Sequence, residues 1–376
     1  MTLTVIQVLP ALEVGGVERG TLEVAAELVK RSHRSIVISG GGRMVSELTG
    51  QGSEHITFPI GKKSLLTLRL VSRLRNILEK EDVSVLHVRS RLPAWISYLA
   101  WRTMDHDSRP AFITTVHGPY TVNPYSRIMV RGEKVIAISG FIKDYIVRNY
   151  PETDTNKIIV IPRGVSSDQY PYGYQPSSEW IAKWNNQHPS LAGKYIVTLP
   201  ARVTRWKGHE DFLGILKIAL SESLPVHGLI AGGPHPGKES FLKELVSSVR
   251  DMGLDQHITF LGHRDDMKEI MAISNVVFSL AREPEAFGRT ALEALSLGTP
   301  VIAYNHGGAA EVMAAMFPAG AVMPHDINAA TKKLKEFINQ HPTVTNKNCF
   351  TLENMLSKTI SVYESLSRAD KILPSA

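Results

Sequence analysis

The chain has 376 residues, of which 43% are hydrophobic and 21% are charged, with a formal net charge of +6. Its apolar runs are interrupted and fall short of the roughly 20 apolar residues of a membrane-spanning helix. The opening "MTLTVIQVLP" lacks a signal peptide's basic region and cleavage site, and Cys349, the single cysteine, cannot form an internal disulfide. We therefore expect a globular, cytoplasmic, two-domain protein with an anionic partner. No zinc-finger or RNA-binding signature points to nucleic acid.

Strand-like apolar runs alternate with amphipathic helical patterns along the chain. The first series runs from "TVIQVL" through "VSVLHV" and "FITTVH" to "IIVIP", and the second runs from "YIVTLP" to "PVIAY". Residues 166–192, rich in Pro, Ser, Gly and Tyr, separate the two series. This rhythm predicts an α/β protein with two facing Rossmann-like doubly wound domains, residues 1–168 and 190–354, and a ligand in the cleft between them. A final helix at about 355–376 could pack back on the first domain.

The loop and helix after the strand-like run "NVVFSLA" carry an unusual pattern of acids and glycine. We expect the helix to begin near Phe287, so that its first N–H groups, to about Thr290, form an anion site that Gly288 leaves open to a phosphate. Glu293 lies roughly 9 Å along the helix axis. Glu285 could then accept hydroxyls of a donor sugar and Glu293 those of a ribose. Either glutamate taken alone is more simply a surface acid or a helix-stabilising acid.

A second segment, "YIVTLPARVTRWKGHEDFL", predicts a strand, a loop and a helix that deliver Arg202 and Lys207 to a strand end. Two fixed cations there would neutralise a diphosphate leaving group. Gly15 and Gly16 follow the first predicted strand, where backbone can approach a ligand closely, and His117 follows the strand "FITTV". Taken alone, such a glycine pair is usually a turn and a lone histidine is usually structural.

Together these segments resemble the retaining glycosyltransferases of the GT-B fold, in particular family 4. The resemblance rests on Glu285 and Glu293 with seven residues between them, and on "GTPVIA", "HGGAAE", "ARVTRWKG", "VHG" and "GGVER". These motifs follow the family's order over nearly the whole chain. The family usually has glycine where this chain has Ala201, but Arg202 and Lys207 of the same motif are both present.

The resemblance implies roles for individual residues. Arg202 and Lys207 would stabilise the leaving diphosphate, and His117 would lie against the donor sugar. Glu285, the fourth catalytic residue, would face the same sugar and accept its hydroxyls. Gly232, Gly233 and the turn at 261–267 would border the nucleotide. The residues expected to bind the donor are Gly15, Gly16, Arg202, Lys207, Gly232, Gly233, His263, Glu285, Phe287, Gly288, Arg289, Thr290 and Glu293.

The resemblance also implies a reaction, the transfer of a sugar from a nucleotide diphosphate sugar to a hydroxyl acceptor, with retention by front-face attack. No cofactor and no metal would be needed, and no Asp/Glu pair is spaced as nucleophile and acid. Family analogy and the basic first domain favour a UDP-sugar and a saccharide or lipid-linked acceptor, as in the synthesis of lipopolysaccharide or another cell-surface glycan. Another GT-B enzyme, such as a sugar-nucleotide epimerase, and a non-catalytic sugar-nucleotide-binding module remain as alternatives.

Three further patterns give weaker indications. "GGPHPGKES" approximates a phosphate-binding loop, but Glu239 stands where Ser or Thr would ligate magnesium. "LEVGGVERG" lacks the Gly-x-Gly-x-x-Gly spacing of a dinucleotide dehydrogenase. Asp105 and Asp107 mimic a metal motif of another glycosyltransferase fold, but they lie in a polar loop that we expect to be solvated.

The segment 61–82 combines an apolar stripe with positive charge. The stripe consists of Leu66, Leu70, Leu74, Ile77 and Leu78, and the basic residues are Lys62, Lys63, Arg69, Arg73 and Arg75. The simpler interpretation is a helix that packs its leucines on a sheet and exposes its arginines to water. The alternative is a basic face that docks on an anionic membrane, here the inner face of the plasma membrane.

Overall fold

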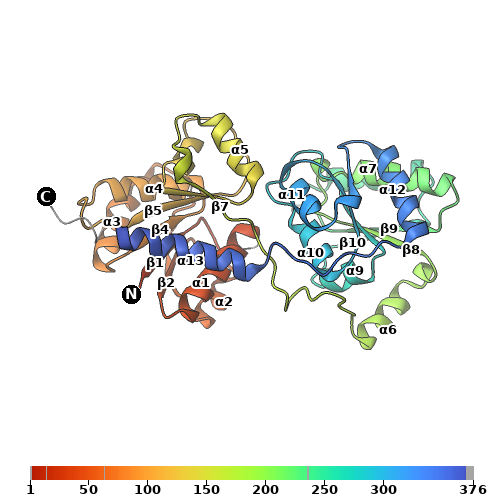
Figure 1. The fold of residues 1–376 in the computed structure, drawn as a ribbon, viewed down its shortest axis with the longest axis horizontal. Coiled ribbons are helices and arrows are strands. Elements are labelled where there is room, and N and C mark those ends of the chain that lie inside the picture. The colour runs from red at the N-terminus through yellow and green to blue at the C-terminus, as the bar shows by residue number, and fades with distance from the viewer. Residues whose placement is uncertain (1, 14, 63, 235–236, 370–376) are drawn as a thin grey trace. The chain divides into compact units, whose positions relative to one another are not determined.

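The computed structural model describes residues 2–13, 15–62, 64–234 and 237–369. The chain forms two compact units, Met1–Pro162 together with Glu353–Ala376, and Arg163–Leu352 (Figure 1). Each unit is built on one parallel sheet with helices packed around it. The predicted α/β class with two Rossmann-like doubly wound sheets is therefore confirmed.

The first unit has a seven-stranded sheet in the order β3-β2-β1-β4-β5-β6-β7, in which all neighbouring strands are parallel. The strands are β1 (Thr4–Val8), β2 (Arg34–Ser39), β3 (Glu54–Thr57), β4 (Val85–Val88), β5 (Ala111–Val116), β6 (Lys134–Ala137) and β7 (Ile158–Val160). The helices are α1 (Gly16–Lys30), α2 (Val45–Gly50), α3 (Leu70–Lys80), α4 (Arg91–Arg102), α5 (Gly140–Asn149) and α13 (Leu352–Ala369), with 3-10 turns η1 (Leu65–Arg69), η2 (Ser126–Val130) and η3 (Thr155–Lys157).

Helix α3 packs its apolar stripe inward, as the simpler interpretation of segment 61–82 predicts. Leu70, Leu74 and Leu78 are buried, whereas Arg69 and Arg73 are exposed. Lys63 and the side chain of Leu66 lie outside the described residues. Among the described residues, every helix is too short or too polar to cross a lipid bilayer.

Helix α13 belongs to the first unit although it comes last in the sequence. Figure 1 shows it in dark blue, labelled among the red and orange elements of that unit. Its Tyr363 hydroxyl lies 2.6 Å from His87 Nδ1, and His87 Nε2 lies 2.6 Å from the Thr115 hydroxyl. All three side chains are buried. This hydrogen-bonded chain joins α13 to β4 and β5 and pairs polar groups that would be costly to bury alone.

The second unit has a six-stranded sheet in the order β10-β9-β8-β11-β12-β13, again with parallel neighbours. The strands are β8 (Tyr195–Pro200), β9 (Val226–Ala231), β10 (Ile258–Gly262), β11 (Val276–Ser279), β12 (Val301–Tyr304) and β13 (Ala321–Val322). The helices are α6 (Ser178–Gln187), α7 (His209–Ser221), α8 (Ser240–Asp251), α9 (Met267–Ile273), α10 (Arg289–Leu297), α11 (Gly307–Met316) and α12 (Ile327–Gln340), with 3-10 turns η4 (Pro189–Leu191), η5 (Arg205–Lys207) and η6 (Pro318–Gly320).

The strand order of this second sheet reverses between β8 and β11. The chain runs from β8 outward to β9 and β10, and then returns to the other side of β8 for β11, β12 and β13. The loops that follow β8 and β11 therefore leave the sheet in opposite directions. In doubly wound proteins such a switch point opens a crevice at the carboxyl ends of the strands, where ligands bind.

Candidate active site

Two loops at the β8/β11 switch point carry the predicted cationic and acidic residues. We define the β8 loop as residues 201–208 and the β11 loop as residues 280–288. The Arg282 N–H donates to the Trp206 carbonyl at 2.7 Å, which joins the two loops. On the other side, the Val203 N–H donates to the Gly233 carbonyl at 3.1 Å, next to β9. Main-chain hydrogen bonds therefore hold the β8 loop between both of its neighbours.

Lys207 of the β8 loop and Glu285 of the β11 loop form an ion pair. Their side chains are only 19% and 14% exposed, and the Lys207 ammonium also lies 4.2 Å from the centre of the Trp206 ring, in cation–π contact. A cavity of about 10 Å³ is lined by both charged side chains and by Thr290. This is the volume of about one water molecule, so a sugar ring does not fit inside it. The structure thus brings together two of the predicted catalytic residues.

Helix α10 begins at Arg289, two residues later than predicted. Gly288 precedes it with a φ of +85°, and Phe287 is buried with its ring edge-to-face against Phe350 at 5.6 Å. Phe287 is therefore anchored in the loop and not in the helix. The first-turn N–H groups belong to a helix start whose Thr290 lines the same cavity as the ion pair.

Glu293 lies one turn into α10 and pairs with Arg289. The Arg289 Nε donates to Glu293 Oε1 at 2.8 Å, an i,i+4 contact. This pair was not predicted from the sequence, where the Glu293 carboxylate was expected to bind a ribose. Whether Glu293 binds a ribose stays a prediction.

The glycine pair at the start of α11 packs against the β11 loop. The Gly308 N–H donates to the Glu285 carbonyl at 2.7 Å, and a Cβ on Gly308 would lie 2.4 Å from Phe287 Cα. A Cβ on Gly288 would lie 2.6 Å from Ala309 Cα. Close backbone packing and a positive φ therefore require Gly288, independently of the phosphate contact that the sequence analysis assigned to it. The same packing fixes the backbone that carries Glu285.

The predicted nucleotide-border residues lie at the ends of the neighbouring strands. Gly232 follows β9 with a φ of +153°, and a Cβ there would lie 2.1 Å from the Ala201 carbonyl oxygen. A Cβ on Gly233 would lie 3.8 Å from the backbone nitrogen of His263, whose side chain is exposed. Arg202, beside Ala201, is also exposed. Gly232 thus allows the end of β9 to approach the β8 loop closely, whereas a Cβ on Gly233 would be in ordinary van der Waals contact.

In the loop after β9, which approximates a phosphate-binding loop, a side chain of the loop itself accepts a hydrogen bond from the backbone. The Gly237 N–H donates to Glu239 Oε1 at 2.9 Å. His235 and Pro236 lie outside the described residues. A carboxylate at this N–H is unfavourable for a phosphate at the same position, which argues against the P-loop alternative.

Arg282 anchors the β11 loop through contacts that the sequence analysis missed. Its guanidinium lies 2.6 Å from Glu210 and 2.6 Å from Asp211, both in the first turn of α7. The Tyr304 hydroxyl of β12 donates to Asp211 at 2.8 Å. The hydrogen bond to Asp211 raises the pKa of Arg282 above its usual value, so the guanidinium that joins the β11 loop to α7 remains charged. Acids in a first helical turn are common, so no sequence signal marked this role.

The remaining predicted site residues lie in the first unit. His117 directly follows β5, and its N–H donates to the Tyr120 hydroxyl at 3.3 Å. Gly15 precedes α1 at an exposed position, where a Cβ would lie 2.6 Å from Glu18 Oε2. Gly16 is the first residue of α1. Their roles toward a donor stay predictions.

Asp105 and Asp107 lie on an exposed turn, where the Asp107 N–H donates to Asp105 Oδ1 at 3.1 Å. In the part of the chain that the structure describes, no group of three or more His, Cys, Asp or Glu side chains is arranged to hold a metal ion. Cys349 is an exposed free thiol.

Comparison with known proteins decides the family. Residues 14–169 match Glycosyltransferase Family 4, and residues 181–348 match Glycosyl transferases group 1. A glycosyltransferase from Rickettsia africae ESF-5, solved by crystallography, is 32% identical and has a TM-score of 0.85, over 97% of this chain and 98% of that chain. The chain belongs to the group 1 glycosyltransferases. The family resemblance of the sequence motifs is therefore confirmed.

Other relatives of this glycosyltransferase are more distant. Spore coat protein SA of Bacillus subtilis (strain 168) is 25% identical over 63% of this chain and 63% of its own length. The lipopolysaccharide core biosynthesis mannosyltransferase LpsB of Rhizobium meliloti (strain 1021) is 28% identical over 65% of this chain and 69% of its own length. The chain spans less than two thirds of several curated relatives that it matches, spore coat protein SA among them. Anabaena Alr3699/HepE, solved in complex with UDP, shares the fold with 18% identity and a TM-score of 0.76, over 99% of this chain and 100% of that chain.

Proposed function

We propose that this glycosyltransferase moves a sugar from a nucleotide diphosphate sugar to an acceptor hydroxyl, with retention of configuration and without a metal ion. The observation that carries the proposal is the Lys207–Glu285 pair beside the start of α10 at the β8/β11 switch point. A fixed cation and a helix N-terminus both attract a diphosphate, and a carboxylate accepts hydrogen bonds from sugar hydroxyls.

The chemistry follows from how charge develops as the glycosidic bond breaks. The leaving diphosphate gains negative charge, which Lys207 and the exposed Arg202 would stabilise. The acceptor oxygen bonds to the anomeric carbon on the face from which the phosphate departs, and a leaving phosphate oxygen takes the acceptor's proton. Configuration is then retained, and no side chain has to act as the base. A bound phosphate would compete with Glu285 for the Lys207 ammonium and free the carboxylate for the sugar.

A UDP-sugar is the donor we propose, with a saccharide or lipid-linked acceptor in lipopolysaccharide or other cell-surface glycan synthesis. Two kinds of relative support this proposal. Anabaena HepE was solved with UDP and with UDP-glucose. The names of two other similar proteins refer to lipopolysaccharide biosynthesis. They are the mannosyltransferase LpsB and the glycosyltransferase WaaG, whose crystal structure is known.

The experiment is a thermal-shift screen of the full chain with UDP-, GDP- and ADP-sugars, followed by assay of UDP release with and without saccharide acceptors. Ligand at 100 times its dissociation constant stabilises by about 2.7 kcal/mol, which gives a measurable shift. NMR of the product's anomeric proton then tests retention. An epimerase would convert the donor without an acceptor, and a binding module would shift the melting temperature without turnover. Either result would overturn transfer.

Glu285→Gln provides the matched site test. Glutamine keeps the shape and one acceptor oxygen of the carboxylate but removes its charge. We expect turnover to fall while the melting temperature changes little. Equal losses of stability and activity would instead assign Glu285 a structural role.

We also propose reversible attachment to an anionic membrane surface at the inner face of the plasma membrane, through η1 and the outer face of α3. Lys62, Arg69 and Arg73 are exposed there, and Leu68 is 54% exposed beside them. Each basic residue near such a surface contributes about 1 kcal/mol. Cosedimentation with phosphatidylserine vesicles should fall at high salt and on reversal of Arg69 and Arg73 to Glu. Reversal of the exposed Lys217 and Lys332 of the second unit is the control. Equal recovery with neutral phosphatidylcholine vesicles would contradict the proposal.

A further inference from the structure

The second unit contains a larger pocket at the edge of its sheet opposite the candidate active site. We call it the amino-edge pocket, because Tyr195 is the first residue of β8, Asn275 directly precedes β11 and Pro300 directly precedes β12. Its volume is about 330 Å³, at the lower end of the roughly 300–1,000 Å³ of small-molecule sites. Since β8 has six residues at about 3.3 Å each, the length of the sheet separates this pocket from the Lys207–Glu285 pair.

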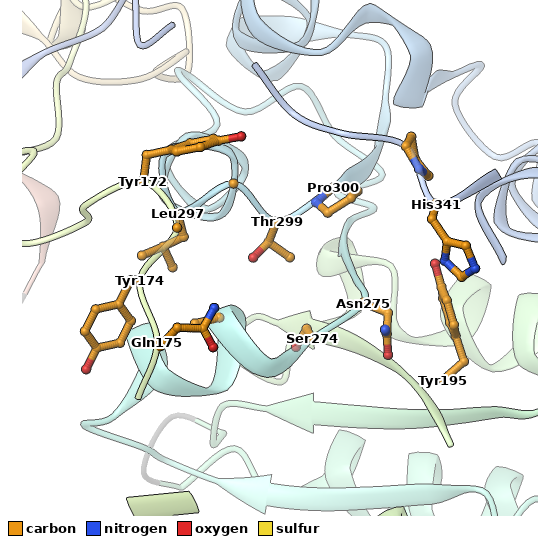
Figure 2. Close-up of a pocket in the computed structure, with 14 residues that line it drawn as sticks. Tyr172, Tyr174, Gln175, Tyr195, Ser274, Asn275, Leu297, Thr299, Pro300 and His341 are labelled. Carbon is orange, nitrogen blue, oxygen red and sulfur yellow. The ribbon is translucent and has the colours of Figure 1, made fainter. Parts of the chain in front are cut away.

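Hydrogen bonds within the protein hold the walls of the amino-edge pocket in place. The Tyr172 hydroxyl donates to the Val344 carbonyl at 2.6 Å, and the Gly173 N–H donates to the Leu297 carbonyl at 2.9 Å. These contacts fix the segment 172–175 as one wall. Figure 2 shows Tyr172, Tyr174 and Gln175 on one side of the pocket, Tyr195, Asn275 and His341 on the other, and Thr299 between them. The pocket is therefore preformed.

Several polar groups of the lining are available to a ligand. Among the described lining residues there is no Lys, Arg, Asp or Glu. Asn275 Oδ1 accepts from the Ile196 N–H at 2.7 Å, but Asn275 Nδ2, the Gln175 amide, the Tyr195 hydroxyl and the His341 ring make no hydrogen bond within the described part of the chain. Tyr195 is partly buried, and its unpaired hydroxyl is not among the polar atoms shut off from solvent, so a ligand can reach it.

We propose that the amino-edge pocket binds one ring of an uncharged saccharide, at a site separate from the transfer reaction. Sugars present hydroxyls that both donate and accept, and amides, a tyrosine hydroxyl and an imidazole offer both functions. The rings of Tyr172 and Tyr195 supply the apolar faces that such pockets combine with a few polar groups. Phosphorylated or carboxylated ligands fit poorly, because neither lysine nor arginine is among the described lining residues to compensate their desolvation.

The test uses the full chain and saturation-transfer NMR with methyl α-D-glucopyranoside, methyl α-D-mannopyranoside, methyl β-D-galactopyranoside and maltose, each with and without saturating UDP. We expect transfer to at least one of these sugars, unchanged when UDP is added. Glucose 6-phosphate should compete more weakly than the neutral sugar that binds best. No transfer to any of the sugars, loss of transfer on adding UDP, or stronger competition by glucose 6-phosphate would overturn the proposal.

Two variants probe the lining without disturbing the walls. Tyr195→Phe removes an unpaired hydroxyl, so it should leave the melting temperature unchanged and weaken sugar binding by roughly three- to tenfold, the value of one hydrogen bond. Asn275→Asp keeps the acceptor for the Ile196 N–H but removes the donor, and it should weaken binding to a similar extent. Tyr98→Phe in the first unit is the matched control. An equal loss of affinity in the control, or unchanged affinity in both variants, would contradict the assignment.

Discussion

Lys207 shares its ammonium between the Glu285 carboxylate and the face of the Trp206 ring. Because the side chain is largely shielded from solvent, its charge acts through a lower effective dielectric than that of a surface lysine. A diphosphate that enters this site would meet a cation already held in position by the backbone of the β8 loop. Such preorganisation is what stabilises charge that develops in a transition state.

Lys207→Ala should lower kcat by around a hundredfold or more, the scale for removal of one transition-state charge stabiliser. Steady-state release of UDP measures this effect. Lys217→Ala, an exposed lysine on α7, is the matched control and should leave kcat unchanged. A Lys207→Ala enzyme with the turnover of the unmodified chain would remove Lys207 from the mechanism.

His209, the first residue of α7, gives the second unit a stability that depends on pH. The side chain is fully buried, and this burial lowers its pKa to about 4. The unfolded chain takes up the proton near pH 6.5, whereas the folded chain resists it until about pH 4. The contribution of His209 to the free energy of unfolding should therefore be at its full value above pH 6.5 and fall by about 1.4 kcal/mol per pH unit between pH 6.5 and 4.

Urea unfolding at several pH values between 7 and 4.5 checks this slope. Burial also lowers the pKa of His227 to about 4, so a second histidine of the same unit adds to the slope. His209→Phe should flatten the dependence by the contribution of one group. A variant with the full slope would show that other residues cause the acid sensitivity.

The β8 and β11 loops hold the site because glycine lets them approach closely. Gly208, between Lys207 and α7, has a φ of +77°, and a Cβ there would lie 1.9 Å from the Leu280 carbonyl oxygen. Gly253 has a similar φ of +69° but open space around it. Alanine at either position carries the cost of a left-handed backbone, whereas only Gly208 adds a clash.

Gly208→Ala should therefore lower the free energy of unfolding by about 1–3 kcal/mol more than Gly253→Ala, the usual cost of overpacking. Chemical denaturation of both variants isolates this packing contribution. We also expect reduced turnover in Gly208→Ala alone, since Lys207 is its neighbour. Equal destabilisation of the two variants would mean that the loops move apart without cost.

Local patterns predicted the elements well, and tertiary contacts account for the differences. The run "YIVTLP" became β8 because its first five residues are apolar or β-forming and fit a strand covered on both faces. The start of α10 was predicted two residues early, since Phe287 packs on Phe350, a partner distant in sequence. The Lys207–Glu285 pair was not predicted as a contact. It forms because β8 and β11 are neighbours in the sheet, although β9 and β10 lie between them in the sequence. The sequence suggested that Gly288 is a glycine in order to admit a phosphate. Its positive φ and its close packing on Ala309 also require glycine at this position.

The amino-edge pocket had no sequence signal. Tyr172, Tyr174 and Gln175 lie in the segment that composition marked only as a connection between domains. Their common pocket with His341 arises from chain segments that meet only in the folded unit. Periodicity within one segment cannot reveal such a site.

For the molecule as a whole, we expect transfer to survive EDTA. The cations proposed at the leaving group, Arg202 and Lys207, belong to the protein, so chelation should not remove them. The measurement is the transfer rate before and after dialysis against EDTA, with a manganese-dependent glycosyltransferase treated in parallel as control. Complete loss of activity, restored by manganese or magnesium, would refute the prediction and return attention to Asp105 and Asp107.

The first unit is discontinuous in sequence, whereas the second unit is one unbroken segment. Domains fold as units while the chain emerges from the ribosome. All seven strands of the first unit precede the second unit in the chain, but the first unit still lacks α13 while the second unit is being made. Until Tyr363 emerges, His87 and Thr115 lack the hydroxyl that ends their hydrogen-bonded chain. The unit that is synthesised first is thus the last to receive all of its helices.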